Sequence, residues 1–443
     1  TIQGTSQRGA RFTNATGIGL SWMNFTNNGT NQDAAATCGD ALNGTNTNCG
    51  AGIDLQGVTG VTLDRLALSG GTQMGLNGNN VTNLVLTNST VQNVGDEVNE
   101  DGVQLVNLKG TCTMTDATFS GNFHRQLELQ NSGAANGLTS LSITRVTFNR
   151  GTYVSTAAQG FLVAGHNGAA MNVTVQDSDF LNNFGSGFFA QGVGTTATYT
   201  LGDVATAANG NVFTNNSLAA QLVSDGGAYT ATLGNNAHTV TATVTSGATP
   251  FTFRKANPAT GLYVGNFIAN QVGNATAQSG TNCNGCNGLS ITNEGLSGNQ
   301  RMTVSNNTIR NVNQRGLEAL LQLDDVMGVV VTGNAIQDPF DQANHVGQAI
   351  FGQSNTDATD NGTMCMDVQT NTIGGSWDLG VGLGARNIRL RQAPAGGAAP
   401  LRLRNIGGTT ATDANNYLNA NNTNAAAACT ALTGFTTGTA PCF

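Results

Sequence analysis

The sequence predicts an all-β protein, a right-handed, single-stranded parallel β-helix with three sheets and a short C-terminal cap. Three observations predict this fold. A short apolar alternation recurs along most of the 443 residues, glycine and asparagine separate its copies, and charged residues make up only 9% of the chain. Internal repeats of this kind are typical of solenoids, in which each repeat packs only against its neighbours.

The first repeated pattern is an apolar residue, any residue, a second apolar residue, four mostly polar residues and a third apolar residue. It fits Ile18-Leu20-Phe25, Val61-Leu63-Leu68, Leu84-Leu86-Val91, Cys112-Met114-Phe119, Leu141-Ile143-Phe148, Val173-Val175-Phe180, Met302-Val304-Ile309, Val329-Val331-Ile336 and Met366-Val368-Ile373. Alternation with a period of two predicts short strands with one buried face. The last apolar position advances by 23 to 33 residues from Leu68 to Phe213, which fits one coil of three strands and their turns.

A second pattern follows the first: glycine, apolar, any residue, apolar. Its copies begin at Gly52, Gly102, Gly160, Gly187, Gly316 and Gly380. The asparagines and glycines between the patterns tolerate a left-handed backbone, so each strand is expected to end in a tight bend. In-register stacking of the coils then predicts ladders of like side chains, aliphatic and Phe inside and Asn at the bends.

On these repeats the chain resembles the bacterial right-handed parallel β-helix proteins, a superfamily that includes pectate lyases, polygalacturonases, phage tailspikes and adhesin-like surface proteins. The resemblance covers about residues 10–392 and implies the fold but no particular activity. The C-terminal stretch, with Ile388-Arg389-Leu390-Arg391-Gln392 followed by a Pro/Gly/Ala linker and an Asn-rich segment, is similar to secreted Asn/Thr/Gly-rich surface proteins of Gram-negative bacteria.

The predicted organisation is a β-helix over 1–392 and a linker with a capping tail over 393–443. Threonine-rich alternation over about 195–262 indicates an irregular insert, and segments 29–51 and 272–289 are expected to be projecting loops. Thr412 or Asp413 is the expected N-cap of a helix in the tail. No comparable cap is visible before Ile18, so an open N-terminal edge could join a second copy end to end, or the chain could have been trimmed there.

Cysteines and charge restrict the compartment and the partners. Eight cysteines include three close pairs, which predict the disulfides Cys38–Cys49, Cys283–Cys286 and Cys429–Cys442 and an exported protein. Cys112 is expected to be a small buried hydrophobe. A net charge of −8 with two lysines argues against nucleic-acid binding, and the short apolar runs argue against a membrane span.

Candidate site residues cluster at one bend. Outward positions of the second pattern are expected to align, which brings together Asp54, Gln104, Glu128 and later Glu318. The preceding bend supplies Asp96, Glu97, Glu100 and Asp101, and the next coil supplies His124 and Arg125. The catalytic candidates are Glu100, Asp101, His124, Arg125 and Glu128, and the candidates for ligand binding are Asp54, Asp96, Glu97 and Gln104.

Carboxylates beside an imidazole and a guanidinium suit glycoside hydrolysis or Ca²⁺-assisted elimination. The same residues are also consistent with a solvated acidic turn neutralised by Arg125, or with sugar or Ca²⁺ binding without turnover. The pair Asp324-Asp325 lacks the partner motifs of polygalacturonases, so no catalytic residue carries over from the resemblance. No calcium-binding nonapeptide is present, and we predict no metal site and no cofactor, with Ca²⁺ unsupported by a motif.

These observations favour a non-catalytic structural or adhesive protein, secreted or held at the cell surface, whose partner is a second copy of itself or a cell-surface polysaccharide. The first alternative is a polysaccharide-active lyase or glycoside hydrolase that uses the acidic lateral face. The second is a tailspike-like receptor-binding protein, which requires a trimer. A basic group at Arg386, Arg389, Arg391, Arg402 and Arg404 either neutralises the acidic chain or docks a neighbouring subunit.

Overall fold

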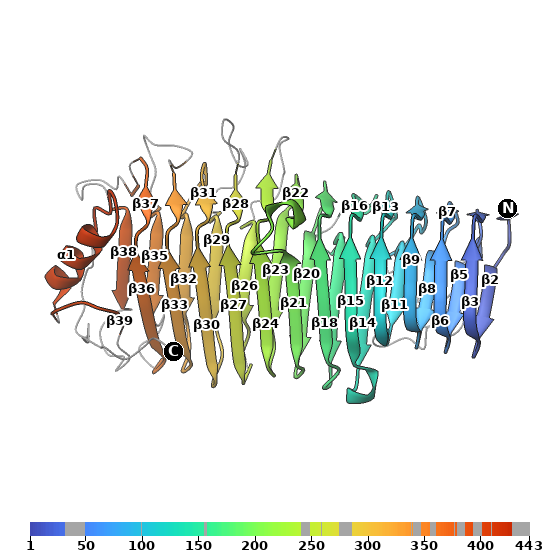
Figure 1. Ribbon diagram of the computed structural model, residues 1–443, viewed down its shortest axis with the longest axis horizontal. Coiled ribbons are helices and arrows are strands. Elements are labelled where there is room, and N and C mark those ends of the chain that lie inside the picture. The colour runs from blue at the N-terminus through green and yellow to red at the C-terminus, as the bar shows by residue number, and fades with distance from the viewer. Residues whose placement is uncertain are drawn as a thin grey trace. The chain divides into compact units, whose positions relative to one another are not determined.

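The computed structural model describes most of the chain. The described residues are 1–31, 49–98, 100–154, 157–240, 249–257, 259–273, 286–337, 339, 347–354, 360–375, 377–378, 386–392, 401–408 and 410–427. Within them the strands form three parallel sheets of 13 strands each, and strands of one sheet recur at every third position in the chain (Figure 1). The protein is therefore a three-sheet parallel β-helix, as predicted.

The three sheets are named A, B and C. Sheet A contains β1 Ile2–Gln3, β4 Asn24–Thr26, β7 Ala67–Ser69, β10 Thr90–Gln92, β13 Thr118–Ser120, β16 Thr147–Asn149, β19 Asp179–Leu181, β22 Val212–Thr214, β25 Ala237–Thr239, β28 Gln271–Val272, β31 Thr308–Ile309, β34 Ala335–Ile336 and β37 Thr372–Ile373. Sheet B contains β2 Arg8–Thr13, β5 Ala51–Gln56, β8 Met74–Asn79, β11 Val103–Val106, β14 Leu127–Ser132, β17 Phe161–His166, β20 Ser186–Val193, β23 Leu218–Ser224, β26 Phe251–Lys255, β29 Leu289–Asn293, β32 Leu317–Leu321, β35 Ile350–Ser354 and β38 Ile388–Gln392. Sheet C contains β3 Thr16–Ser21, β6 Thr59–Asp64, β9 Thr82–Thr87, β12 Gly110–Thr115, β15 Leu138–Thr144, β18 Met171–Gln176, β21 Ala197–Gly202, β24 Tyr229–Gly234, β27 Leu262–Ile268, β30 Asn299–Ser305, β33 Val326–Thr332, β36 Thr363–Gln369 and β39 Leu401–Leu403.

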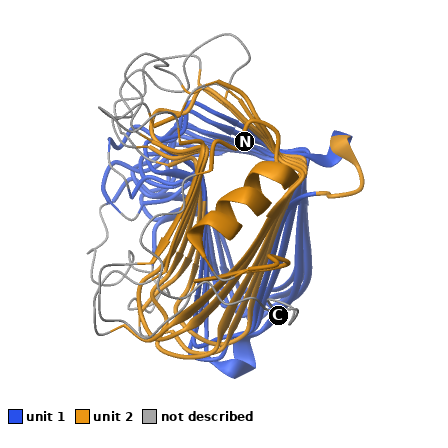
Figure 2. Ribbon diagram, turned by 90° about the vertical axis from the view of Figure 1, so that its left-hand side faces the viewer, with its two compact units in different colours: residues 1–202, 208–220 blue, residues 203–207, 221–443 orange. Residues whose placement is uncertain are grey.

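The described helices are short: the 3₁₀ turns η1 Ala134–Asn136 and η2 Ala207–Asn209 and the α-helix α1 Ala411–Asn421. None of them is long and apolar enough to cross a membrane. The chain divides into two compact units (Figure 2). Unit 1 comprises Thr1–Gly202 and Ala208–Ala220, and unit 2 comprises Asp203–Ala207 and Gln221–Phe443.

Aromatic stacking fixes the core of unit 1. Phe119, Phe148, Phe180 and Phe213 occupy the same position of consecutive sheet A strands and pair in direct register. Their ring centroids are 5.6, 4.8 and 4.7 Å apart in sequence order, and all four rings are fully buried. Each buried ring contributes about 1.5–3 kcal/mol of transfer free energy. The predicted ladder of inward Phe side chains is confirmed.

An asparagine ladder runs along the bends between sheets C and A in unit 2. Its members, all nearly or fully buried, are Asn236, Asn270, Asn307, Asn334, Asn371 and Asn422. Each Asn up to Asn371 donates from its backbone N–H and its Nδ2 to the Oδ1 of the next, over 2.8–3.2 Å. The predicted Asn ladder is confirmed, and it satisfies backbone donors that the bends remove from the sheets.

The segment 195–262 continues the coils, so the expected irregular insert is not observed among its described residues. β21 to β27 all belong to the three sheets. Tyr199, Tyr229 and Tyr263 fill inward positions of sheet C and are buried, and His238 fills the inward position of β25. A sequence pattern of aliphatic and Phe residues does not include these three tyrosines or His238. The same pattern places Ile268 at the buried sheet A position of its coil, whereas the residue found there is Val272.

Helix α1 caps unit 2. Thr410 is its N-cap, because the Thr410 hydroxyl accepts from the Asp413 backbone while the Asp413 carboxylate accepts from the Thr410 backbone. The expected N-cap at Thr412 or Asp413 was therefore wrong, since Asp413 is the third helical residue of this capping box. β39 belongs to sheet C, so the β-helix extends beyond residue 392 to Leu403. The linker 393–400 lies outside the described residues.

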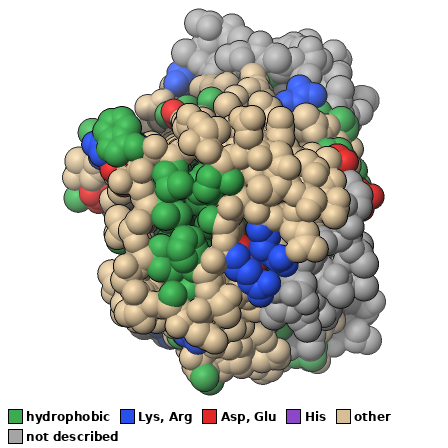
Figure 3. Space-filling model, turned by 90° about the vertical axis from the view of Figure 1, so that its right-hand side faces the viewer, with side chains coloured by type: hydrophobic (Ala, Val, Ile, Leu, Met, Phe, Trp, Pro, Cys, Tyr) green, Lys and Arg blue, Asp and Glu red, His purple; other side chains and the backbone are tan. Residues whose placement is uncertain are grey.

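The N-terminal end of unit 1 lacks such a cap within the described residues. β1, β2 and β3 stand first in their sheets. The inward side chains Phe12 and Leu20 are only half-buried there. Figure 3 shows apolar side chains gathered on this end beside basic ones.

The predicted loops 29–51 and 272–289 fall largely outside the described residues, as do Cys38, Cys283, Cys429 and Cys442. The three predicted disulfide pairings therefore stay predictions. Cys49, Cys286 and Cys365 are disulfide-bonded, whereas Cys112 is free and buried, as expected for a small core residue.

Candidate functional site

The outer side of sheet B in unit 1 carries a row of polar side chains. Strand alternation turns Asp54, Asn77, Gln104 and Glu128 away from the core, and the parallel register pairs each with the next. All four are at most 1% exposed. The structure thus places the predicted residues in one row, but that row is not a solvated surface. Glu318, the fourth predicted member, lies on β32 of unit 2.

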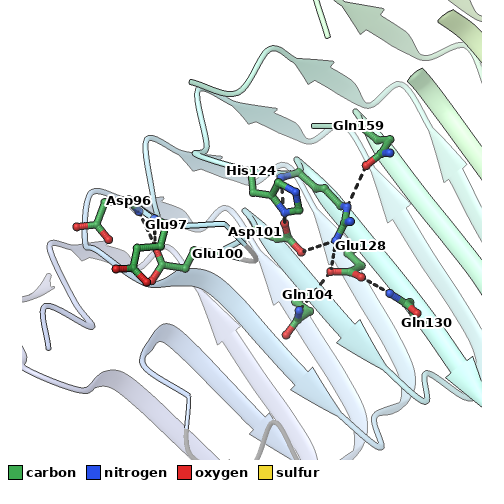
Figure 4. Close-up of polar contacts among 10 residues, drawn as sticks. Asp96, Glu97, Glu100, Asp101, Gln104, His124, Glu128, Gln130 and Gln159 are labelled. Atoms are coloured by element: carbon green, nitrogen blue, oxygen red, sulfur yellow. Dashed lines mark hydrogen bonds and ion pairs between the residues drawn. The ribbon is translucent and has the colours of Figure 1, made fainter. Parts of the chain in front are cut away.

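Four titratable side chains, Asp101, His124, Arg125 and Glu128, meet beside this row and are called the charged quartet, although the His124 ring among them is neutral. Figure 4 shows Asp101, His124 and Glu128 of this quartet. His124 Nδ1 lies 3.0 Å from Asp101 Oδ1, which also accepts from the Arg125 backbone N–H at 2.9 Å. The Arg125 guanidinium lies 3.0 Å from Glu128 Oε2 and 4.0 Å from Asp101 Oδ2. Arg125 therefore bridges two carboxyl groups from neighbouring coils.

Side-chain amides complete the contacts of the quartet. Gln104 Nε2 donates to Glu128 Oε2 at 3.2 Å, and Gln130 donates to Glu128 Oε1. Arg125 Nε donates to Gln159 Oε1 at 3.0 Å. The sequence analysis missed Gln130 and Gln159. Two signals could have found them, because Gln130 is two residues after Glu128 on the same strand face, and Gln159 precedes β17 as Arg125 precedes β14.

His124 is neutral in this environment. Its pKa is lowered to about 3, mainly by burial and in addition by the neighbouring Arg125 guanidinium, against the opposing effect of Glu128. A neutral imidazole with Nδ1–H donating to Asp101 leaves Nε2 as an acceptor. Nε2 is buried and has no hydrogen-bond partner among the described residues. The contact with Asp101 is therefore a hydrogen bond to a neutral ring rather than an ion pair.

Glu128 is the titratable group of the quartet near neutral pH. Burial raises its pKa to about 7; Arg125 opposes this rise and the adjacent Asp101 adds to it. Near pH 7 the Glu128 carboxyl group can therefore gain or lose a proton, and the quartet also contains the neutral imidazole of His124. That combination is what general acid–base catalysis requires of its side chains.

Access is the second requirement for catalysis, and the described residues do not provide it. Asp101, His124 and Glu128 are 0%, 1% and 1% exposed. The hydrogen bonds and ion pairs of Asp101 and Glu128 are directed at other residues of the quartet and at amide side chains. In the described part of the chain, the quartet forms a closed network that ties two bends to sheet B.

Glu100, Asp96 and Glu97 form a separate group. Glu100 Oε2 accepts from the backbone N–H groups of Asp96 and Glu97, both at 2.6 Å, and its Oε1 accepts from Gln73 at 2.6 Å. Burial raises the pKa of Glu100 to about 7 even though the two backbone donors lower it. Asp96 and Glu97 are exposed on the same bend. The Glu100 carboxyl group thus braces a turn and lies apart from the quartet in Figure 4.

Asp54 belongs to a third group, near the start of unit 1. Its carboxylate lies 2.9 Å from Arg8 Nε and 3.3 Å from Arg11 Nε, and it accepts from Asn77 Nδ2 at 3.0 Å and from Gln56 Nε2 at 2.6 Å. Burial raises the pKa of Asp54, and these partners oppose the rise. The nine predicted site residues therefore divide into three groups, of which only the quartet, together with Gln104, combines an imidazole with carboxyl groups.

No cluster of three or more His, Cys, Asp or Glu side chains suited to a metal ion occurs among the described residues. Searches of protein-family models, of curated proteins and of solved structures find no match to this chain.

Proposed function

We propose that this chain is a non-catalytic structural or adhesive β-helix protein, exported to the cell surface or beyond. The observation that supports it best is the closure of the charged quartet. Its two carboxyl groups and its imidazole are at most 1% exposed, and the carboxyl groups are engaged by Arg125 and by amides. A catalytic set would have to reach a substrate, whereas a closed network stabilises the bends of neighbouring coils.

The outer side of sheet C supports an adhesive role. In unit 1 its central row is uncharged and consists of Thr62, Val85, Thr113, Ser142 and Thr174, paired in register. None of these side chains is buried. Four of the five side chains carry a short hydroxyl group, and Val85 interrupts them. These hydroxyl groups can exchange hydrogen bonds with a sugar chain without the desolvation cost of charges.

The test is a screen of acidic and neutral polysaccharides with the wild-type protein and with Glu128→Gln. We expect retention on immobilised polysaccharide that is equal for the two proteins, with no new reducing ends and no unsaturated products from either. Product formed by the wild type and lost in Glu128→Gln would overturn the proposal. Failure of both proteins to bind any polysaccharide would leave the structural role and remove the adhesive one.

The alternative is a polysaccharide-active lyase or hydrolase that works at the quartet. The specific observation in its favour is the pKa of about 7 at Glu128, in the same quartet as a neutral His124 whose buried Nε2 can act as an acceptor. For this alternative we expect a bell-shaped dependence of activity on pH with one limb near 7, which the screen detects when it is run from pH 5 to pH 9.

The open N-terminal edge suggests end-to-end stacking of copies, and the C-terminal cap is an argument against this geometry. Asn422 ends the asparagine ladder, and the Ala425 carbonyl oxygen accepts from the Ile388 backbone N–H of β38 at 3.1 Å. Head-to-tail stacking through sheet edges would need this end to be free. We therefore expect a monomer in light scattering. Large particles would support end-to-end assembly, and a trimer would support the receptor-binding alternative.

A further inference from the structure

Unit 2 carries three arginines on the outer side of sheet B. Two of them belong to the basic group expected from the sequence, and the third, Arg315, does not. Glu318, Phe351 and Arg389 pair in register on β32, β35 and β38. The Arg315 and Arg391 guanidinium carbons lie 4.0 and 5.2 Å from the centroid of the Phe351 ring. We call Arg315, Arg389 and Arg391 the arginine cluster. Arg402 and Arg404 are on or next to β39 of sheet C and do not belong to it.

In the described part of the chain, positive charge exceeds negative charge at the arginine cluster. Arg315 forms an ion pair with Glu318, which also accepts from Asn287 at 2.7 Å. The other carboxylate that acts on Arg315 is Asp378, which accepts from Gln348 at 2.7 Å. Among the residues that the structure describes, three guanidinium groups thus face two carboxylates, although the whole chain carries a net charge of −8.

Two of the arginines lack a carboxylate partner within the described residues. Arg391 Nε donates to the uncharged Gln353 Oε1 at 2.6 Å. Arg389 Nε is buried and has no hydrogen-bond partner. A buried guanidinium N–H without an acceptor costs free energy comparable to a lost hydrogen bond. The pKa of Arg315 is lowered to about 10, mainly by burial and in addition by the like charges of Arg391 and Arg389, against the opposing effect of Asp378.

We propose that the arginine cluster is a binding site for an oxyanion, a carboxylate, sulfate or phosphate group. The planar guanidinium matches these groups with two parallel N–H donors, and Phe351 holds two of the three guanidiniums by contact with its ring. A bound oxyanion supplies the acceptor that Arg389 Nε lacks and balances the surplus charge. The site is independent of the proposed adhesive role, because it uses a different sheet and a different unit.

The proposal is tested by isothermal titration of the full chain with sodium sulfate, sodium phosphate and sodium glucuronate at constant ionic strength. We expect saturable binding of one anion per chain. Arg389→Met keeps the aliphatic stem and removes the charge, so it should weaken binding at least tenfold, and Arg391→Met should act in the same direction. Glu318→Gln removes an internal competitor and should tighten binding severalfold. The matched control is Arg402→Met, an exposed arginine of the same unit.

A second pair of titrations, with dextran sulfate and uncharged dextran, distinguishes an anion carried on a polymer from a free one. Tighter binding of the sulfated polymer that is lost in Arg389→Met identifies the polymer as the source. The proposal is overturned if no anion gives saturable heat, or if Arg402→Met loses as much affinity as Arg389→Met. Circular dichroism checks that each variant is folded, and Arg391→Met provides the same reading if Arg389→Met is not.

Discussion

Replacing Glu128 with glutamine should stabilise the protein at alkaline pH and leave it nearly unchanged at acid pH. The carboxyl group has a pKa of about 7 in the folded protein and 4.5 in the reference state, because it is buried. A raised folded pKa means that the folded state holds the proton more tightly. The ionised group is therefore destabilising above pH 7, and this cost fades as pH falls through 7 toward 4.5.

The size of the effect follows from the same two values. The linkage relation gives a destabilisation by Glu128 of about 3 kcal/mol at pH 8 and about 1 kcal/mol at pH 5. Glutamine cannot ionise but has the shape of the protonated acid, and Arg125 keeps Asp101 as a partner in the variant. The stability difference between variant and wild type should therefore change by about 2 kcal/mol between the two pH values, in favour of the variant at pH 8.

Urea denaturation followed by circular dichroism at pH 5 and pH 8 measures this difference. The histidines of the unfolded chain titrate in the same way in both proteins, so their contribution cancels from the stability difference. Asp116→Asn is the matched control: Asp116 is an exposed carboxylate paired with Arg145, and its replacement should change stability little at either pH value. An equal change at both pH values for Glu128→Gln, or destabilisation at pH 8, would refute the assigned environment.

Two further predictions concern stability. Asn307→Ala removes the side-chain hydrogen bonds with the preceding and following rungs of the asparagine ladder, and we expect it to cost about 3 kcal/mol or more in urea denaturation. The control Asn266→Ala, which lies outside the ladder, should cost about 1 kcal/mol or less. Equal costs for the two variants would show that the ladder does not matter. Burial lowers the pKa of His238 to about 4, so the unfolded chain binds that proton more readily and stability falls as pH drops from 6.5 through 4. His238→Val should gain about 3 kcal/mol relative to wild type at pH 4 compared with pH 8, and a pH-independent difference would contradict this.

The fold could be predicted because the spacing of apolar residues and asparagines along the sequence determines it. Phe119, Phe148 and Phe180 recur at one coil length, and asparagine recurs at one bend, so strand, turn and stacking all follow from spacing. The same reasoning failed where an inward position holds a residue with a polar atom. Tyr199 and His238 are buried like their aliphatic counterparts, but a pattern of apolar residues does not include them.

The candidate site was predicted less well, because alternation tells which way a side chain points but not whether it is exposed. Asp54 and Glu128 point away from the core, as expected, yet both are buried. Burial is what raises the pKa of Glu128 and lowers that of His124. This burial depends on how the bends of neighbouring coils pack over sheet B. The alternation of apolar and polar residues along a strand does not predict the conformation of those bends.

The clearest example is a motif that occurs twice. Arg125-Gln126-Leu127-Glu128 and Arg315-Gly316-Leu317-Glu318 enter sheet B in the same way, and each forms an Arg–Glu ion pair three residues apart. In unit 1 the adjacent coil adds Asp101, so the guanidinium is fully balanced. In unit 2 the following coils add Phe351 and two more arginines instead, which leaves surplus positive charge among the described residues. A similar local sequence, with an Arg and a Glu three residues apart, therefore gives a closed network in one unit and a proposed anion site in the other, and the residues that neighbouring coils place beside it decide which.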